Sequence, residues 1–347
     1  MKYILLIFAF LLINACETTA PERTGPVEVR YAGETMGTTY HVIYFDTTGR
    51  DFQSSMDSLL LAINAEVSTY EPESFISKWN RSTQGIEIKS PLAQTHPHFA
   101  VNLDNAFATY QKTDGYFDAT IMPLVNYWGF GYTQKRLATA ADSLKVDSLV
   151  QMVGMSDKVE YREGAHLRKT NPAVQLDFSA NAKGYAVDEL GRLLEARGVG
   201  NYYVEIGGEV RARGEKPGGV LWSIGISTPR ENAPVTDVQE IVELDNRSVA
   251  TSGNYRIFYE VEGQKLSHII NPKTGYPERR NLLSASVFAK DCITADAYAT
   301  AFMVMGTEAA FAFASQQPDI EAYLIFADEN DELKFMYTDG LKGVFRE

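Results

Sequence analysis

The sequence is poor in cysteine and in basic residues. Two cysteines occur among 347 residues, and 32 Lys and Arg stand against 45 Asp and Glu, a formal net charge of −13. Because no run of Lys and Arg offsets this charge, we expect no nucleic-acid partner. An acidic protein that handles phosphate groups must supply positive charge locally, through a metal ion, a helix N-terminus or a few cations.

Long hydrophobic runs are also missing. The apolar run from Tyr3 to Ile13 follows a single charge at Lys2 and is too short to span a bilayer. It is typical of a secretory signal peptide. Its end, INAC at 13–16, resembles a bacterial lipoprotein signal, in which Cys16 becomes the lipidated first residue. A buried N-terminal helix is the alternative.

This leader divides the chain into three expected parts: a signal peptide at 1–15, the lipidated Cys16 with a flexible tether at 16–27, and one domain at 28–347. We expect acyl chains on Cys16 to hold the protein in membrane lipid of the bacterial cell envelope, at the inner membrane and facing the periplasm. Glu17 is not the aspartate that commonly marks inner-membrane retention, so the outer membrane stays open. With Cys16 lipidated, only Cys292 remains, which excludes an intramolecular disulfide.

The rest of the chain has the composition of a large globular domain. Hydrophobic residues make up 45% of it, with 19 Tyr and 18 Phe. Alternation predicts two paired strands within 27–45, and helical spacing predicts a helix from Phe52 to Val67 with Asp51 as its N-cap. We expect further helices at about 97–112, 139–153, 181–197, 293–304 and 307–316, and strands at about 174–178, 201–206, 220–227, 238–244, 255–261, 265–270, 283–289, 321–326 and 333–337. Short turns between the later strands favour an α+β fold with a largely antiparallel sheet flanked by helices.

The stretch LDFSANAKGYAVDEL at 176–190 places a lysine where an expected strand leads into a helix. Asp177 closes the strand, and Lys183-Gly184 opens the helix. The lysine could bind phosphate, form a Schiff base or lie on the surface. Free N–H groups at the helix start and the lysine charge would both favour a phosphate. The P-loop pattern G-x-x-x-x-G-K-[ST] is missing, so an ordinary P-loop is excluded.

Three segments could approach a ligand with glycines or aromatic rings. Glycines flank Met36 in GETMGTTY, which suits close approach to a ligand or an ordinary hairpin. A helix ends near Tyr70, which could stack on a planar ring or cover the core. In DGYFDATIMPLVNYWGFG at 114–131, aromatic residues crowd around Asp118, as in a pocket for a flat heterocycle or in an aromatic core.

Two further segments carry polar groups suited to catalysis. His268 precedes an Asn-Pro turn, where it could be a base, although a lone strand histidine is more often structural. Asp296 and Thr300 are four residues apart and so share one face of the expected helix. A carboxylate beside a hydroxyl suits Mg²⁺, which takes oxygen ligands.

In their order along the chain, these segments resemble the ApbE family of flavin transferases. The matching blocks are MGTTY, the Tyr70 segment through Asn80, GYFDATIMPLVNYWGFG, LDFSANAKGYAVD, EIGGEVRARG, ATSGNYR, SHIINPKTGYP and ADAYATAFMVMG, and they span about 31–306. The resemblance implies an ApbE-like, T-fold-like catalytic domain of two intimate subdomains. It also implies an FAD:protein FMN transferase, which cleaves FAD with Mg²⁺, joins FMN to a Thr or Ser of an exported protein and releases AMP. Acceptors are typically flavoprotein subunits of membrane redox complexes.

The resemblance also implies roles for individual residues. It assigns Mg²⁺ to the side chains of Asp296 and Thr300 and to the backbone carbonyl of Ala180. His268 matches the histidine that takes the proton from the acceptor hydroxyl, a role suited to a group with a near-neutral pKa. The residues implied to contact FAD are Met36, Tyr70, Tyr116, Phe117, Asp118, Asp177, Lys183 and His268.

The chain departs from the family pattern at Phe75, Asn181 and Asn271, none of them an implied ligand. Two other functions stay open. Water could replace the acceptor, which would make the protein an FAD pyrophosphatase that forms FMN and AMP. The protein could also be a non-catalytic flavin-binding lipoprotein. Mere binding needs no metal-activated phosphate, and it is disfavoured by the presence together of Asp296, Thr300, Lys183 and His268.

Overall fold

The computed structural model describes residues 25–132, 143–162, 164–230, 237–254, 258–261, 264–278 and 280–346. The expected signal peptide and the lipidation site at Cys16 therefore lie outside the described residues. Within the described ranges, no helix combines the length and the apolar character needed to cross a bilayer. Val27, the last residue of the expected tether, is already the first residue of a strand.

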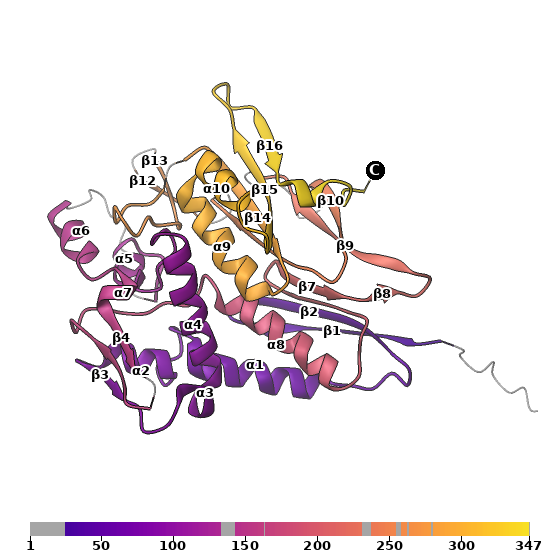
Figure 1. Ribbon diagram of the computed structural model, residues 1–347, viewed down its shortest axis with the longest axis horizontal. Coiled ribbons are helices and arrows are strands. Elements are labelled where there is room, and N and C mark those ends of the chain that lie inside the picture. The colour runs from indigo at the N-terminus through magenta and orange to yellow at the C-terminus, as the bar shows by residue number, and fades with distance from the viewer. Residues whose placement is uncertain are drawn as a thin grey trace, which may run out of the picture.

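A large antiparallel sheet is the centre of the described structure (Figure 1). Its strand order is β1-β2-β6-β7-β11-β14-β15-β16, and each neighbouring pair is antiparallel. The strands are β1 Val27–Thr35, β2 Thr38–Asp46, β6 Tyr202–Ile206, β7 Glu209–Arg213, β11 Ser248–Gly253, β14 Leu282–Ala289, β15 Ile320–Ala327 and β16 Leu333–Tyr337. The α+β fold class with a largely antiparallel sheet is thus confirmed, and with it the hairpin expected within 27–45.

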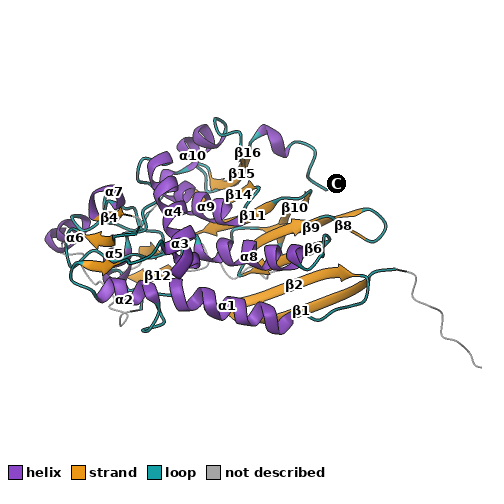
Figure 2. Cartoon of the chain, turned by 60° about the horizontal axis from the view of Figure 1, so that its bottom comes forward, coloured by secondary structure: helices purple, strands orange, loops and turns teal. Residues whose placement is uncertain are grey.

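Helices cover one face of this sheet, as Figure 2 shows from a second side. They are α1 Gln53–Val67, α4 Pro97–Lys112, α8 Ala182–Ala196, α9 Cys292–Met305 and α10 Thr307–Ala314. Helix α9 packs on β11 and β14, and α8 packs on β6, β7 and α9. Twelve of the 14 residues of α9 are buried, as expected for a helix enclosed between a sheet and other helices.

Smaller elements surround this core (Figure 1). One group consists of α2 Phe75–Arg81, β3 Gly85–Glu87, α3 Leu92–Thr95, α5 Met122–Tyr127, α6 Ser143–Val150, α7 Met155–Lys158, β4 Val159–Arg162 and β5 His166–Lys169. On the other side of the molecule, β8 Glu215–Lys216, β9 Val220–Ser227 and β10 Val238–Leu244 form a second sheet. The hairpin of β12 Phe258–Val261 and β13 Gln264–Ser267 and the 3₁₀ turn η1 Asp339–Leu341 complete the described elements.

Both faces of the main sheet are buried. Val287 and Leu324 belong to the large cluster under the helices. Their neighbours Phe288 and Tyr323 belong to a second cluster, which also contains Trp222 of β9. Because successive side chains of a strand point to opposite faces, this alternation lets one sheet support two cores. The helical face is the one that carries the candidate site.

The local pattern predicts most elements well. The bounds of α4, β9, β10 and β16 agree with the expected ranges. Of the expected helix at 139–153, α6 covers 143–150, and residues 139–142 lie outside the described residues; of the expected strand at 255–261, β12 covers 258–261. Asp51 lies one residue before the N-cap Phe52, yet its carboxylate still accepts the N–H of Gln53 at 2.8 Å.

The strand expected at 174–178 is wrong. Only an isolated parallel bridge joins Gln175 to Ile121 there. The backbone N–H and C=O of Leu176 bond instead to the side-chain amide of Asn80, at 2.7 and 2.8 Å. The N–H of Asp177 donates to the carbonyl of Ala119 at 2.8 Å. Side-chain bonding thus takes the backbone groups that a ladder would need.

Candidate active site

Helices α8 and α9 meet where α8 begins, and this contact brings two expected site segments together. The backbone N–H of Gly184 donates to Oδ2 of Asp296, on α9, at 2.9 Å. Gly184 is the third residue of α8, so its N–H belongs to the first turn, which has no intrahelical carbonyl to bond. A Cβ at position 184 would lie 2.4 Å from the carbonyl oxygen of Cys292 and 2.8 Å from Cβ of Asp296. The glycine after Lys183 therefore permits the close approach of the two helices.

Lys183 pairs with a carboxylate that the sequence analysis did not single out. Its Nζ lies 3.3 Å from Oε1 of Glu209, the first residue of β7. The Lys183 side chain is 27% exposed, whereas that of Glu209 is only 6% exposed. Burial works to lower the pKa of Lys183, but the charges of Asp296 and Glu209 outweigh it and raise that pKa above its ordinary value. The ammonium therefore stays charged at the edge of the site.

The charged cluster consists of Lys183, Glu209 and Asp296, and so holds one ammonium and two buried carboxylates. Burial raises the pKa of both Asp296 and Glu209. Oε2 of Glu209 is buried and has no hydrogen-bond partner among the described residues. Burial thus works against the charged forms of both acids, and a bound cation would offset that cost.

Two further oxygen donors, the Thr300 hydroxyl and the Ala180 carbonyl, lie on or next to the helices of this cluster. Thr300 follows Asp296 by one helical turn, and its hydroxyl lies 3.2 Å from Oγ of Ser252 on β11. Ala180 precedes the N-cap Asn181, so its carbonyl lies outside the α8 hydrogen-bond ladder. A carboxylate, a hydroxyl and a backbone carbonyl are the kind of ligands that Mg²⁺ takes, with water or phosphate oxygens completing its shell. No group of three or more His, Cys, Asp or Glu side chains suited to a metal occurs in the described ranges; the expected set contains one carboxylate and does not need such a group.

Asp177 lies directly before this cluster and is buried. Its Oδ1 accepts the backbone N–H of Ser179 at 2.9 Å and also the hydroxyl of Ser179. Burial raises the pKa of Asp177, while Ser179 and the charge of Lys183 work to lower it. Asp177 therefore shapes the turn that leads into α8, and the charge of Lys183 acts on its carboxylate.

The aromatic segment at 114–131 divides between core and surface. Phe117 and Trp128 are buried in hydrophobic clusters, whereas Tyr116 is half-buried, with Nζ of Lys273 4.0 Å from its ring centroid. The carboxylate of Asp118 accepts both the N–H and the hydroxyl of Thr120, at 2.8 and 2.6 Å, and the N–H of Met155 at 3.2 Å. Asp118 therefore fixes the shape of its own loop, and Tyr116 is the ring of this trio that a ligand can reach.

Three implied residues come from separate segments. Met36 lies at the tip of the β1–β2 hairpin with a φ of 50° and is half-buried. Tyr70 follows α1 and is 66% exposed. His268 follows β13 and is half-buried, with its ring 6.3 Å from that of Phe130. The structure thus joins Lys183, Asp296 and Thr300 through α8 and α9, whereas Met36, Tyr70 and His268 lie on three separate segments, at a hairpin tip, after a helix and after a strand.

Two residues of the site have no role in the sequence-based predictions. Glu209 lies within the motif EIGGEVRARG and Ser252 within ATSGNYR. Glu209 follows Gly207 and Gly208, whose φ values of 62° and 107° form the turn between β6 and β7. An acid at the start of a strand that packs under a helix was the signal available for Glu209. Ser252 offered none beyond its place in ATSGNYR.

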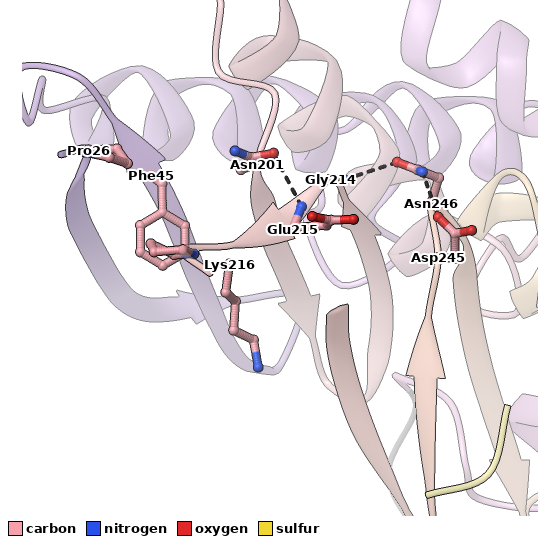
Figure 3. A pocket seen from close by; sticks show the side chains of 9 residues that line it. Pro26, Phe45, Asn201, Gly214, Glu215, Lys216, Asp245 and Asn246 are labelled. Carbon is pink, nitrogen blue, oxygen red and sulfur yellow. Dashed lines mark hydrogen bonds between the residues drawn. The ribbon is translucent and has the colours of Figure 1, made fainter. Parts of the chain in front are cut away.

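A polar pocket at the other end of β2 is separate from this cluster (Figure 3). Phe45, Asn201 and Glu215 are among its lining residues. Glu209 pairs with Ile206, which pairs with Tyr40, so five residues of β2, about 17 Å, separate the cluster from Phe45. The amide of Asn201 accepts the N–H of Glu215 at 3.2 Å. The polar lining of this pocket is thus engaged in holding a turn.

Comparisons with known proteins agree on one family. Residues 36–324 match the sequence model of the ApbE family. The FAD:protein FMN transferase of Haemophilus influenzae is 36% identical over 310 residues, covering 87% of each chain, and that of Vibrio cholerae is 35% identical over 317 residues, covering 90% of each. The structure of the flavin transferase ApbE from Vibrio cholerae is similar with a TM-score of 0.81 at 33% identity, over 92% of this chain and 99% of that one. The apo form of Pseudomonas stutzeri flavinyl transferase ApbE gives 0.80 at 31%, over 93% and 98%.

Proposed function

This chain belongs to the ApbE family, and from that premise we propose that it is an FAD:protein FMN transferase. In the proposed reaction it uses Mg²⁺, transfers FMN from FAD to a Thr or Ser hydroxyl of an exported flavoprotein subunit, and releases AMP. The observation that carries the proposal is the meeting of Asp296 with the first turn of α8, beside the Lys183–Glu209 pair. This meeting of α8 and α9 puts carboxylate oxygens next to the Lys183 ammonium in a protein whose net charge is negative.

The groups of the cluster suit the binding of a pyrophosphate. Asp296, Thr300 and the carbonyl of Ala180 would hold Mg²⁺, which when bound would neutralise charge on the phosphate oxygens. The ammonium of Lys183 is partly exposed and stays charged, so it can meet a phosphate oxygen from the open side. Asp177 keeps the turn before α8 in place through its bonds to Ser179.

The flavin half would lie against residues from several segments. Tyr116 and Tyr70 offer accessible rings, and Met36 offers a soft side chain at a hairpin tip. Phe117 is 3% exposed, and the carboxylate of Asp118 is bonded within its own loop. We therefore assign any contact of Phe117 or Asp118 with FAD to the backbone.

The proposed transfer is a displacement at phosphorus. The acceptor hydroxyl oxygen bonds to the phosphorus of the FMN half of FAD, and the bond from that phosphorus to the bridging oxygen breaks. AMP leaves with the bridging oxygen and its electron pair, and the hydroxyl proton passes to His268. A half-buried histidine next to a glycine- and proline-rich loop is suited to accept that proton from an incoming chain.

The experiment combines the full-length chain in detergent with FAD, Mg²⁺ and an acceptor that carries the family's Asp-x-x-Thr-Gly-Ala-Thr type of target. Intact-mass measurement should show the acceptor heavier by one FMN, with an equal amount of AMP in solution. Asp296→Ala should abolish both products, whereas Glu308→Ala, which changes an exposed acid on α10, should leave them unchanged. AMP release with unmodified acceptor would instead establish the pyrophosphatase. Full activity of the Asp296→Ala protein would show that the metal assignment is wrong.

We also propose that acyl chains on Cys16 anchor the enzyme in the bacterial cell envelope, at the inner membrane and facing the periplasm, where exported acceptors are found. The leader that ends in INAC at 13–16 supports this placement. An alkyne fatty acid fed to the producing cells should label the wild-type chain but not a Cys16→Ala variant. Equal labelling of the two would remove Cys16 as the anchor.

A further inference from the structure

Glu209 is the member of the cluster to which the proposed function gives no role. It is 4% exposed, and one carboxylate oxygen lies 3.3 Å from Nζ of Lys183. The other oxygen, Oε2, is buried without a hydrogen-bond partner among the described residues. A buried carboxylate that is only half paired costs stability, so its presence calls for an explanation beyond packing.

The backbone fixes the position of Glu209. Ile206 and Glu209 pair across the turn made by Gly207 and Gly208, so Glu209 is the first residue after a tight two-residue turn. On β7 it shares a face with Arg211, because alternate residues of a strand point the same way. Val210, on the opposite face, belongs to the second hydrophobic cluster. Glu209 therefore points to the helical side of the sheet, where Lys183 lies.

Lys183 stands between two carboxylates and solvent. Its ion pair is with Glu209, while Asp296 accepts the N–H of Gly184 and acts on Lys183 through its charge. If Glu209 were neutral, Asp296 would be the buried charge left to attract the ammonium. A Lys183–Asp296 pair would occupy the carboxylate that the proposed reaction needs for a divalent cation.

We propose that Glu209 is a positioning residue, which holds the Lys183 ammonium against β7 and so keeps it available to the phosphates of FAD and away from Asp296. The inference rests on the proposed function, since it concerns the same site. Glu209 touches neither substrate nor metal in this role. It acts by fixing where one positive charge lies.

The test replaces Glu209 by Gln, which keeps the shape of the side chain and removes its charge. FAD binding to the full-length chain in the absence of Mg²⁺ is measured by quenching of flavin fluorescence, and Mg²⁺ binding without FAD by calorimetry. We expect both dissociation constants to rise by about tenfold, the size found for directly coupled groups. Glu209→Asp should recover part of the loss. Glu215→Gln, which neutralises an exposed acid at the start of β8, should match the wild type.

A double-mutant cycle with Lys183→Met separates positioning from a general structural effect. If Glu209 acts through Lys183, Glu209→Gln should add little to the FAD dissociation constant in the Lys183→Met background. An equal loss in both backgrounds would overturn the inference, and so would wild-type binding of FAD and Mg²⁺ by the Glu209→Gln protein. These binding measurements need no acceptor. A wild-type chain that binds FAD but labels no acceptor would therefore count against the proposed function, and the cycle would still decide the role of Glu209.

Discussion

Helix α8 contacts strand β7 through a buried carboxylate at two neighbouring places. At the first, Lys183 meets Glu209, and one oxygen of that carboxylate is left without a partner among the described residues. At the second, Asp188 meets Arg211, two residues further along the same face of β7. Both contacts join a buried carboxylate to a cation. They differ in how completely their atoms are paired.

The second contact satisfies every oxygen of its buried carboxylate. Oδ1 of Asp188 accepts from Nη1 of Arg211 at 2.7 Å and from the N–H of Cys292 at 2.9 Å, and Oδ2 accepts the N–H of Ile293 at 3.0 Å. Arg211 also donates to Glu195, at 3.2 Å. Asp188 thus joins α8, the first turn of α9 and β7. A fully paired buried charge such as Asp188 fixes the fold, whereas the half-paired Glu209 lies next to the oxygen donors of the candidate site.

The largest effect should come from Asp188→Ala, which breaks the complete contact. It leaves Arg211 without its buried partner and two N–H groups at the start of α9 without an acceptor. Removing one partner of a buried pair costs about 3–5 kcal/mol. Urea denaturation should show a fall of that size in the free energy of unfolding. Glu189→Ala, one residue further on the partly exposed side of α8, is the matched control and should change it by less than about 1 kcal/mol. Equally small losses from the two substitutions would show that the complete pairing of Asp188 does not stabilise the fold.

Gly184→Ala tests whether the spacing of α8 and α9 matters for the incomplete contact. The added Cβ would lie 2.4 Å from the carbonyl oxygen of Cys292, so the helices must separate. We expect a loss of about 1–3 kcal/mol in the free energy of unfolding, as for other overpacked sites. FMN transfer should fall by about 10²-fold, because small displacements in a site have large effects on rate.

Gly200→Ala is the control for that change, since an added Cβ there meets no atom within 4 Å. Both proteins are compared by urea denaturation and by the rate of acceptor labelling. A Gly184→Ala enzyme that labels as fast as the Gly200→Ala enzyme would show that the Gly184–Asp296 distance is not important for the reaction.

The sequence predicts elements with a local pattern better than contacts between residues that are distant along the chain. Elements with their own periodicity, such as α4 and β9, are found within their expected bounds. The order of the motifs also singles out Lys183 and Asp296. Their geometry depends on bonds over long separations, since Gly184 and Asp296 are 112 residues apart. No local pattern reports such a bond, and the role of Glu209 as the partner of Lys183 was missed for this reason.

The error at 174–178 has the same origin. The alternation there is real, but Asn80, 96 residues earlier, takes both backbone groups of Leu176. Side-chain competition for backbone groups depends on the tertiary fold and leaves no periodic signal. The aromatic segment behaves likewise: its composition indicates rings in contact, and only the fold decides that Phe117 is buried while Tyr116 is accessible.

Lys169, unlike Lys183, is a buried lysine, and it gives the comparison a pH dependence. Nζ of Lys169 donates to the carbonyls of Asn80 and Val174, at 2.9 and 3.0 Å, and the ammonium has no carboxylate in contact among the described residues. Burial lowers its pKa from 10.5 to about 8. Between these values the unfolded chain binds the proton more readily, so the contribution of Lys169 to stability rises with pH, by at most about 1.4 kcal/mol per unit.

Urea denaturation of the wild type and of Lys169→Met at several pH values within that window measures this effect. The difference in unfolding free energy between the two proteins should shift in favour of the wild type as the pH rises from 8 to 10.5. A difference that stays constant across these pH values would mean that burial does not perturb the Lys169 ammonium.

The smallest effect should come from Arg213→Ala, at the outer end of the same face of β7. Nη1 of Arg213 lies 2.7 Å from Oε2 of Glu195, a shorter distance than that of the Lys183–Glu209 pair, but 47% of its side chain is exposed. Water screens such a pair, and exposed pairs contribute about 0.2–1 kcal/mol. Urea denaturation should show a loss in that range, which should shrink further at high salt. A loss as large as that of Asp188→Ala would mean that the distance between the charges, and not their burial, sets the strength of the contacts between α8 and β7.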